Sequence, residues 1–119
     1  MEPLKIALLG LGQAAQNIHL PALRGLGEQF EVVAVCDPDA AAREAAHAAM
    51  PGAKGYADAP ELIRAGGIEA VVISSPPSEH CDQACAALAA GLQVFCEKPL
   101  AMTLAEADRM LAAAAEANR

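Results

Sequence analysis

A short glycine-rich segment near the start of the sequence has the composition of a phosphate-binding turn. It reads Gly10-Leu11-Gly12-Gln13-Ala14-Ala15, which is the pattern G-x-G-x-x-A. The first glycine permits a tight turn, the second lets a pyrophosphate approach the backbone, and the small residue at 15 lets a following helix pack closely on its strand. The segment therefore predicts a dinucleotide site, provided that a strand precedes it and a helix follows it.

An acidic residue, Asp37, directly follows the second apolar run of the sequence. A carboxylate at this place accepts hydrogen bonds from both hydroxyls of an adenine ribose, and it repels the 2′-phosphate of NADP. Pro38 stands where an arginine could have bound that phosphate, and Arg43 is the one nearby cation that could weaken the preference. The pattern favours NAD over NADP. The alternative is that Asp37 is only a turn residue before Pro38.

Two further loops carry polar residues after apolar runs. One reads Ser75-Pro76-Pro77-Ser78-Glu79-His80, and the other reads Glu97-Lys98-Pro99. A partly desolvated lysine at the end of a buried strand can hold a substrate hydroxyl or carbonyl, or transfer a proton, which makes Lys98 the candidate catalytic residue. The alternatives are a helix start with His80 in its first turn, and a surface lysine in a turn.

These loops can form one site only if the apolar runs are neighbouring parallel strands. Five such runs alternate with helix-like segments, and Pro21 predicts a kink or break near His19-Leu20. Strands are predicted at 4–9, 31–36, 54–56, 69–74 and 92–96, and helices from about 13, at 39–50, from 58 to 66, between 77 and 91, and from 103 onwards. Right-handed crossovers then give an α/β, doubly wound parallel sheet with helices on both faces. Its ligands bind at the carboxyl ends of the strands, where all these loops fall.

Three of the expected helix ends carry signals of their own. Asp58 has Glu61 three residues on, and Thr103 has Glu106, so both pairs predict capping boxes at helix starts. Gly91 is predicted to end the helix that precedes the last strand.

Length and composition restrict the class of protein. The 119 residues, 55% hydrophobic and 19% charged, suffice for one domain, whereas a two-domain dehydrogenase needs more than twice that length. The sequence has no apolar run long enough to span a membrane and no secretion signal, so we expect a cytoplasmic protein. The net charge of −7, without a cluster of Lys and Arg, argues against nucleic acid as a partner.

The four cysteines, Cys36, Cys81, Cys85 and Cys96, include no C-x-x-C pair. In a chain without a secretion signal we expect reduced and mostly buried thiols. Cys81 and Cys85 with His80 would give one helix face and no fourth ligand. Helix packing is therefore favoured over a metal site, and no metal is expected.

The motifs, taken in order, resemble those of a known family. The resemblance is to the N-terminal half of the Gfo/Idh/MocA oxidoreductases, the glucose–fructose oxidoreductase and inositol dehydrogenase family, and it covers essentially all 119 residues. Four ordered motifs carry it: Gly10-Leu11-Gly12 with Ala15, His19-Leu20-Pro21, the Ser75-Pro76 turn with His80, and Gly91 through Glu97-Lys98-Pro99. It implies a Rossmann domain for NAD or NADP, with the strand order 3-2-1-4-5.

The resemblance also implies a role for each site residue. Five residues would lie along the pyrophosphate, and they are Gly10, Gly12, Gln13, Ala14 and Ala15. Asp37 would bind the adenine ribose and Glu97 the nicotinamide ribose, while Ser75, Pro76 and His80 would border the nicotinamide side. Lys98 would lie between cofactor and substrate, and the Lys98-Pro99 bond is a candidate cis peptide.

Members of the family continue with a further strand and an α/β domain that binds substrate and builds the oligomer, and we expect the 119 residues to form the dinucleotide-binding domain without that second domain. The resemblance therefore implies a parent protein that transfers a hydride between a nicotinamide cofactor and a sugar, polyol or related hydroxy or carbonyl compound. The chain alone, a single dinucleotide-binding domain over 1–119, is expected to bind the cofactor without turnover.

Two other classes of function remain open from the sequence. The chain could be a stand-alone sensor or docking module, since the sheet edge beside Leu92-Phe95 and any uncovered apolar surface could pair with a second copy or another protein. A methyltransferase uses a similar glycine loop, but it gives no role to Glu97-Lys98-Pro99 or to Ser75-Pro76.

Overall fold

Five short apolar runs form one parallel sheet, because each is too short for a helix and each is followed by a turn. The computed structural model describes residues 2–12 and 15–119. Its strands run in the order β3-β2-β1-β4-β5. They are β1 (Leu4–Leu9), β2 (Phe30–Cys36), β3 (Lys54–Tyr56), β4 (Ala70–Ile73) and β5 (Gln93–Cys96). The predicted strand order and the parallel pairing are confirmed.

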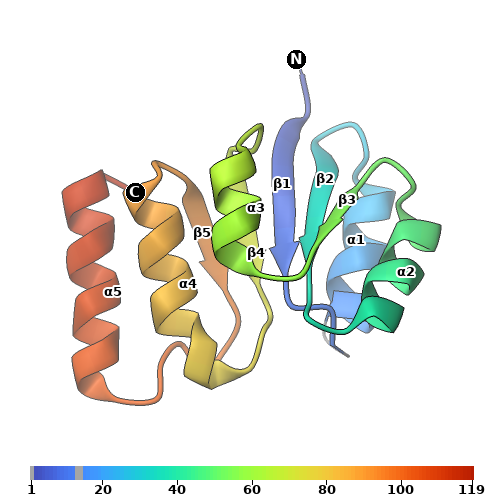
Figure 1. The fold of residues 1–119 in the computed structure, drawn as a ribbon. Coiled ribbons are helices and arrows are strands. Elements are labelled where there is room, and N and C mark those ends of the chain that lie inside the picture. The colour runs from blue at the N-terminus through green and yellow to red at the C-terminus, as the bar shows by residue number, and fades with distance from the viewer. Residues whose placement is uncertain (1, 13–14) are drawn as a thin grey trace.

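Helices connect the strands and cover both faces of the sheet (Figure 1). They are η1 (Ala15–His19), α1 (Leu20–Gly25), α2 (Ala40–Ala49), α3 (Ala59–Ala65), α4 (Pro77–Ala89) and α5 (Leu104–Ala117). The segment η1 is a π-helix that changes to the α-helix α1 at Leu20, with Pro21 in the first turn of α1. The predicted interruption near His19-Leu20 is confirmed as this change of helical type.

Side-chain caps fix the starts of α3 and α5. The Oδ1 atom of Asp58 accepts the Glu61 N–H at 2.8 Å, and Oγ1 of Thr103 accepts the Glu106 N–H at 3.1 Å. In return, Oε1 of Glu106 accepts the N–H of Met102 at 3.0 Å, one residue before the cap. Both predicted caps are confirmed, and each satisfies a backbone donor that has no partner within its helix.

A glycine ends α4, as the sequence predicts. Gly91 has φ +85°, and its N–H donates to the carbonyl of Leu88 at 2.9 Å. The next N–H, of Leu92, reaches back to the carbonyl of Ala87 at 3.0 Å. This pair of bonds is the Schellman motif, which turns the chain from α4 into β5.

The two faces of the sheet carry separate cores. Along β1 the side chains alternate, so that Ala7 and Leu9 pack with α3, α4 and α5, while Ile6 and Leu8 pack with α1 and α2. Figure 1 shows α3 and α4 in front of the sheet and α1 behind it. Because helices cover both faces, β1 is apolar throughout its buried length instead of alternating with polar residues.

The pairing of β1 with β2 contains an irregularity. Ile6 pairs with Val32, but the next residue, Ala7, pairs with Ala34, so Val33 is the extra residue of a bulge. As a result Val32 and Val35 face the same core. The bulge lies three residues before Cys36, the last residue of β2, and Asp37 follows directly; bulges of this kind re-aim the segment of strand that follows them.

Beyond β1, the face of the sheet that α1 covers is left open over β4 and β5. A shallow apolar groove of about 320 Å³ runs there, and β4 and β5 both contribute to it. Phe95 of the edge strand β5 is 59% exposed. Across the described part of the chain, no helix has the length and apolar character needed to cross a bilayer.

We expect Leu62→Ala to lower the free energy of unfolding by about 2–5 kcal/mol, because Leu62 is 1% exposed between α3 and the sheet. The matched control is Leu111→Ala on α5, where the leucine is 64% exposed and the expected change is within about 0.5 kcal/mol. Urea denaturation of both variants gives the comparison. Equal losses would contradict the assignment of the core.

Candidate nucleotide-binding site

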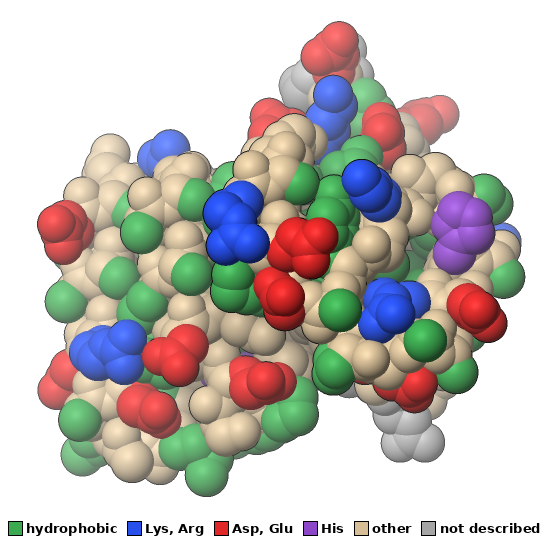
Figure 2. Space-filling model, viewed as in Figure 1, with side chains coloured by type: hydrophobic (Ala, Val, Ile, Leu, Met, Phe, Trp, Pro, Cys, Tyr) green, Lys and Arg blue, Asp and Glu red, His purple; other side chains and the backbone are tan. Residues whose placement is uncertain are grey.

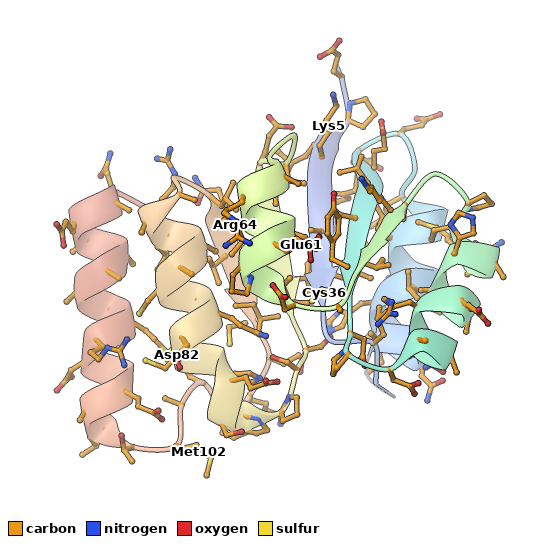
Figure 3. All side chains as sticks on the ribbon, in the orientation of Figure 1. Lys5, Cys36, Glu61, Arg64, Asp82 and Met102 are labelled. Atoms are coloured by element: carbon orange, nitrogen blue, oxygen red, sulfur yellow. The ribbon has the colours of Figure 1, made fainter. Side chains whose placement is uncertain are left out.

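The loops that follow β1, β2 and β4 meet around one cleft at the carboxyl edge of the sheet. Its volume is about 560 Å³. Gly10, Asp37, Ser75 and Pro76, all expected in the site, line it together with residues of the loop after β3 and of α4. Figure 3 places Cys36 at the lower end of the sheet and Asp82 on α4, and both side chains line the same cleft.

Gly10 joins three strand ends through its backbone. Its N–H donates to the carbonyl of Cys36 at 2.8 Å, and its carbonyl accepts the hydroxyl of Ser74 at 2.9 Å. The residue has φ +94°, and a Cβ atom there would lie 2.4 Å from the backbone nitrogen of Ser75. Gly10 is therefore needed for the approach of two loops as well as for the predicted tight turn.

Gly12 has the opposite surroundings. A Cβ at Gly12 would meet no heavy atom within 4 Å, so the space over it is open to a ligand. Ala15, by contrast, is completely buried and starts η1 against the core. Both placements fit the expected roles, with backbone open to a pyrophosphate at one position and close helix packing at the other. Gln13 and Ala14 lie outside the described residues.

Asp37 is anchored to the backbone on both of its oxygens. Oδ2 accepts the N–H of Leu11 at 2.9 Å, and Oδ1 accepts the N–H of Asp39 at 2.9 Å. The side chain thus links the end of β2 to the glycine turn, while each oxygen keeps a further lone pair for a ligand hydroxyl. The two interpretations of Asp37 are compatible, because a carboxylate that orders the turn is also held in place for a ribose.

Arg43 does not extend into the cleft that Asp37 lines. Its Nη1 donates to the backbone carbonyl of Asp37 at 2.7 Å, and its aliphatic stem lies over Gly55 at 3.5 Å from the position of a Cβ. The guanidinium is therefore occupied by the loop that carries Asp37. This placement weakens the idea that Arg43 serves a 2′-phosphate.

His80 differs from the surroundings expected of it. The ring is 1% exposed in the first turn of α4, with Nδ1 2.9 Å from the carbonyl oxygen of Pro99 and Nε2 2.7 Å from that of Ser75. Both ring nitrogens thus face backbone carbonyls, and the ring does not line the cleft. The ring therefore bridges the loops after β4 and β5, and its expected place beside the cofactor stays a prediction.

The loop after β5 carries the remaining site residues. Ser75 Oγ donates to Oε1 of Gln83 at 2.5 Å beside it, and the Glu97 N–H continues the sheet ladder to the carbonyl of Ile73 at 2.9 Å. Lys98 is exposed, so the partial desolvation expected from the sequence is not found. The Lys98-Pro99 peptide bond is cis, as predicted.

The contact of His19 with Glu97 is not predicted by the sequence. Nε2 of His19 lies 2.9 Å from Oε1 of Glu97, which connects the end of η1 to the loop after β5. His19-Leu20-Pro21 stands in the sequence as one of the four ordered motifs and as the place of the predicted kink, with no partner predicted for His19. The available signal was its order in the chain, because a residue in the helix after β1 also lies at the carboxyl edge.

Carboxylates dominate the cleft. Among its described lining residues are Asp37, Asp58, Glu79 and Asp82, and there is no Lys or Arg. Figure 2 shows a wider excess of acidic over basic side chains on the side of the molecule that carries α3 and α4. Burial, and then the charges of Asp37, Asp58 and Glu79, raise the pKa of Cys36 from 9.0 to about 11, with Arg43 acting in the opposite direction.

The four thiols are free, with Cys36 and Cys81 buried and Cys85 and Cys96 half-buried, as expected. Burial and then the charge of Glu97 raise the pKa of Cys96 to about 11. No group of three or more His, Cys, Asp and Glu side chains within residues 2–12 and 15–119 is arranged to hold a metal ion.

The fold and this edge define a nucleotide-binding Rossmann domain, and comparisons with known proteins agree. Inositol 2-dehydrogenase of Salmonella paratyphi B is 40% identical over 111 residues, which are 92% of this chain and 33% of that protein. The WlbA dehydrogenase of Chromobacterium violaceum, solved with NADH and UDP-GlcNAcA, has a TM-score of 0.95 and 31% identity over 100% of this chain and 34% of its own. KijD10, a 3-ketoreductase of Actinomadura kijaniata solved with NADP, has a TM-score of 0.87 and 27% identity over 97% and 35%.

Residues 4–119 match the model of the oxidoreductase family with an NAD-binding Rossmann fold, so the chain belongs to the Gfo/Idh/MocA family and is its NAD-binding domain. The resemblance found in the motifs is confirmed. The chain spans about a third of the length of the curated relatives it matches.

We expect alanine at Gly10 to lower the stability of the fold and alanine at Gly12 to weaken NAD binding. Gly10→Ala lowers the free energy of unfolding by about 2 kcal/mol or more, because φ is positive and the new Cβ meets the Ser75 backbone. Gly12→Ala leaves stability within about 0.5 kcal/mol but weakens NAD binding at least about tenfold, because the methyl group occupies the open space. Urea denaturation and calorimetric titration with NAD measure both. Undiminished NAD binding by Gly12→Ala would contradict the placement of the pyrophosphate.

The raised pKa of Cys36 makes stability fall at alkaline pH. Between about pH 9 and 11 the unfolded chain loses this proton first, so the folded state is destabilised as pH rises, by about 1 kcal/mol at pH 10. Urea denaturation at pH 8 and pH 10 measures the loss, and Cys36→Ala should make it smaller by that amount. Equal losses in the two chains would show that Cys36 is not responsible.

Proposed function

We propose that this chain binds a dinucleotide along the carboxyl edge of its sheet, as the cofactor domain of an NAD-dependent oxidoreductase. The observation that carries the proposal is the contrast between Gly10, closed against Ser75, and Gly12, open to solvent. A phosphate-binding turn needs this combination, since one glycine fixes the loop and the other leaves room for the ligand.

The order of the strand ends supports one direction for the cofactor. Asp37 follows β2, the glycine turn follows β1, Ser75 follows β4 and Glu97 follows β5. With strands about 4.8 Å apart, these ends span roughly 14 Å along one line. The adenine ribose then lies at Asp37, the pyrophosphate over Gly12, and the nicotinamide ribose at Glu97.

When bound, the nicotinamide accepts or supplies the hydride. The part of this chain is to hold the cofactor and to offer Lys98 beside it, where an exposed ammonium can approach a substrate hydroxyl or carbonyl and move its proton. Because Lys98 is exposed here, covering it against solvent falls to the substrate or to another part of the parent protein. We infer that the chain alone binds the cofactor without turnover.

For the substrate of the parent protein we propose a sugar, polyol or related hydroxy or carbonyl compound. The support is the family membership together with the named relatives, which act on inositol or were solved with a sugar nucleotide. Such compounds carry a hydroxyl on the carbon that gives up the hydride, and a lysine at the nicotinamide end suits the proton of that hydroxyl.

A second candidate is a docking role, favoured by the open face over β4 and β5. Phe95 projects from an edge strand with more than half of its surface exposed, and β4 lines the same groove. An apolar face of this kind suits contact with a second copy of the chain or with another protein segment. This role is compatible with cofactor binding, since the groove and the cleft share none of the residues that line them.

For the cofactor we propose NAD in preference to NADP, because the carboxylates around the ribose end repel a 2′-phosphate and Arg43 is turned to the backbone. We expect NAD to raise the melting temperature more than NADP does. Asp37→Ala should narrow the gap, and so should Asp37→Asn, which keeps an acceptor for the glycine turn. Equal shifts from both cofactors in the unaltered chain would contradict the preference.

A further inference from the structure

Two residues far apart in the sequence meet at the nicotinamide end of the proposed site. His19 ends η1 and Glu97 follows β5, and their atoms Nε2 and Oε1 lie 2.9 Å apart. The His19 side chain is 12% exposed and that of Glu97 is 30% exposed. The two groups face each other at the distance of an ion pair, although the angle at Nε2 is not that of a hydrogen bond, and this contact limits the directions in which Glu97 can point.

The His19 ring is held from a second side. The ring of Phe95 lies against it with the centroids 6.0 Å apart and the planes at 76°, which is an edge-to-face arrangement. The π-helix that ends at His19 sets the turn from which this ring projects, and π-helical turns are frequent at functional sites. His19 is thus fixed by packing before any ligand binds.

The backbone of Glu97 is fixed as well. Its N–H completes the ladder to Ile73, and two residues later the carbonyl of Pro99 is held by His80. The remaining freedom of Glu97 is in its side chain, which could turn to solvent or lie along the edge of the sheet. His19 lies within contact distance of its carboxylate.

We propose that His19 is a positioning residue that holds the Glu97 carboxylate toward the ribose next to the nicotinamide. The inference rests on the proposed function, because it needs Glu97 to bind that ribose. One oxygen of Glu97 faces His19 and the other is left to accept from the ribose hydroxyls. Without His19, the carboxylate must be ordered anew each time a ligand binds.

Binding at the two ends of the site can be measured separately with two nucleotides. ADP carries the adenine ribose and pyrophosphate, while ADP-ribose adds the second ribose without the nicotinamide. Calorimetric titration of the 119-residue chain with each gives two dissociation constants, and their ratio reports the contribution of the second ribose. The variants are His19→Leu, which removes the nitrogen, and His19→Gln, whose amide can replace Nε2.

We expect His19→Leu to weaken ADP-ribose binding about tenfold and to leave ADP binding unchanged, because the contact that orients Glu97 lies at one end of the site only. His19→Gln should restore most of the affinity. In a Glu97→Gln background, His19→Leu should have no further effect, since the group that it positions has lost its charge. The control His47→Gln changes an exposed histidine on α2 and should alter neither constant.

Other outcomes distinguish a failure of the proposed function from a failure of the role proposed for His19. If the unaltered chain binds neither ADP nor ADP-ribose, the proposed function fails and this inference fails with it. If ADP-ribose binding is unchanged in His19→Leu, or if both nucleotides lose affinity equally, only the role of His19 is overturned. His19→Asn, whose amide is too short to reach Glu97, provides the same comparison if His19→Leu does not fold.

Discussion

The site depends on one backbone contact, the approach of the turn after β1 to the loop after β4. A side chain at Gly10 would fill the space that the Ser75 backbone occupies, and Ser74 closes the junction by donating to the Gly10 carbonyl. The same turn is tied to β2 through Cys36 and Asp37. Because three strand ends are fixed to each other in this way, the cleft is formed by the protein alone and a ligand does not have to assemble it.

At the other end of the edge, two histidines connect the elements of the site. The loop after β5 at this end is longer and has less regular structure. His80 bridges the carbonyls of Ser75 and Pro99, and His19 contacts Glu97. Both rings belong to helices. The hydrogen bonds of the sheet end at Glu97, and beyond it side chains from these helices contact the loop after β5. The adenine end of the site is thus built mainly from backbone contacts, and the nicotinamide end from side chains that reach across elements.

The sequence predicts the part of this arrangement that follows from local rules. The five strands, their order, the two side-chain caps and the glycine after α4 all depend on residue type and spacing, and these predictions are confirmed. The bulge at Val33, the burial of His80 and the contact of His19 with Glu97 depend on distances between segments far apart in the chain. The exposure of Lys98 is likewise not predictable from local sequence, because it depends on what covers the side chain and not on the strand before it.

The distribution of charge along the edge has a consequence for how a dinucleotide arrives. Four carboxylates line the cleft near β2, β3 and α4, and no Lys or Arg among the described lining residues offsets them. An anionic molecule that diffuses inward is therefore deflected from that end, and its phosphates are steered to the open turn at Gly12. Added salt, by screening this repulsion, should therefore accelerate capture of the ligand.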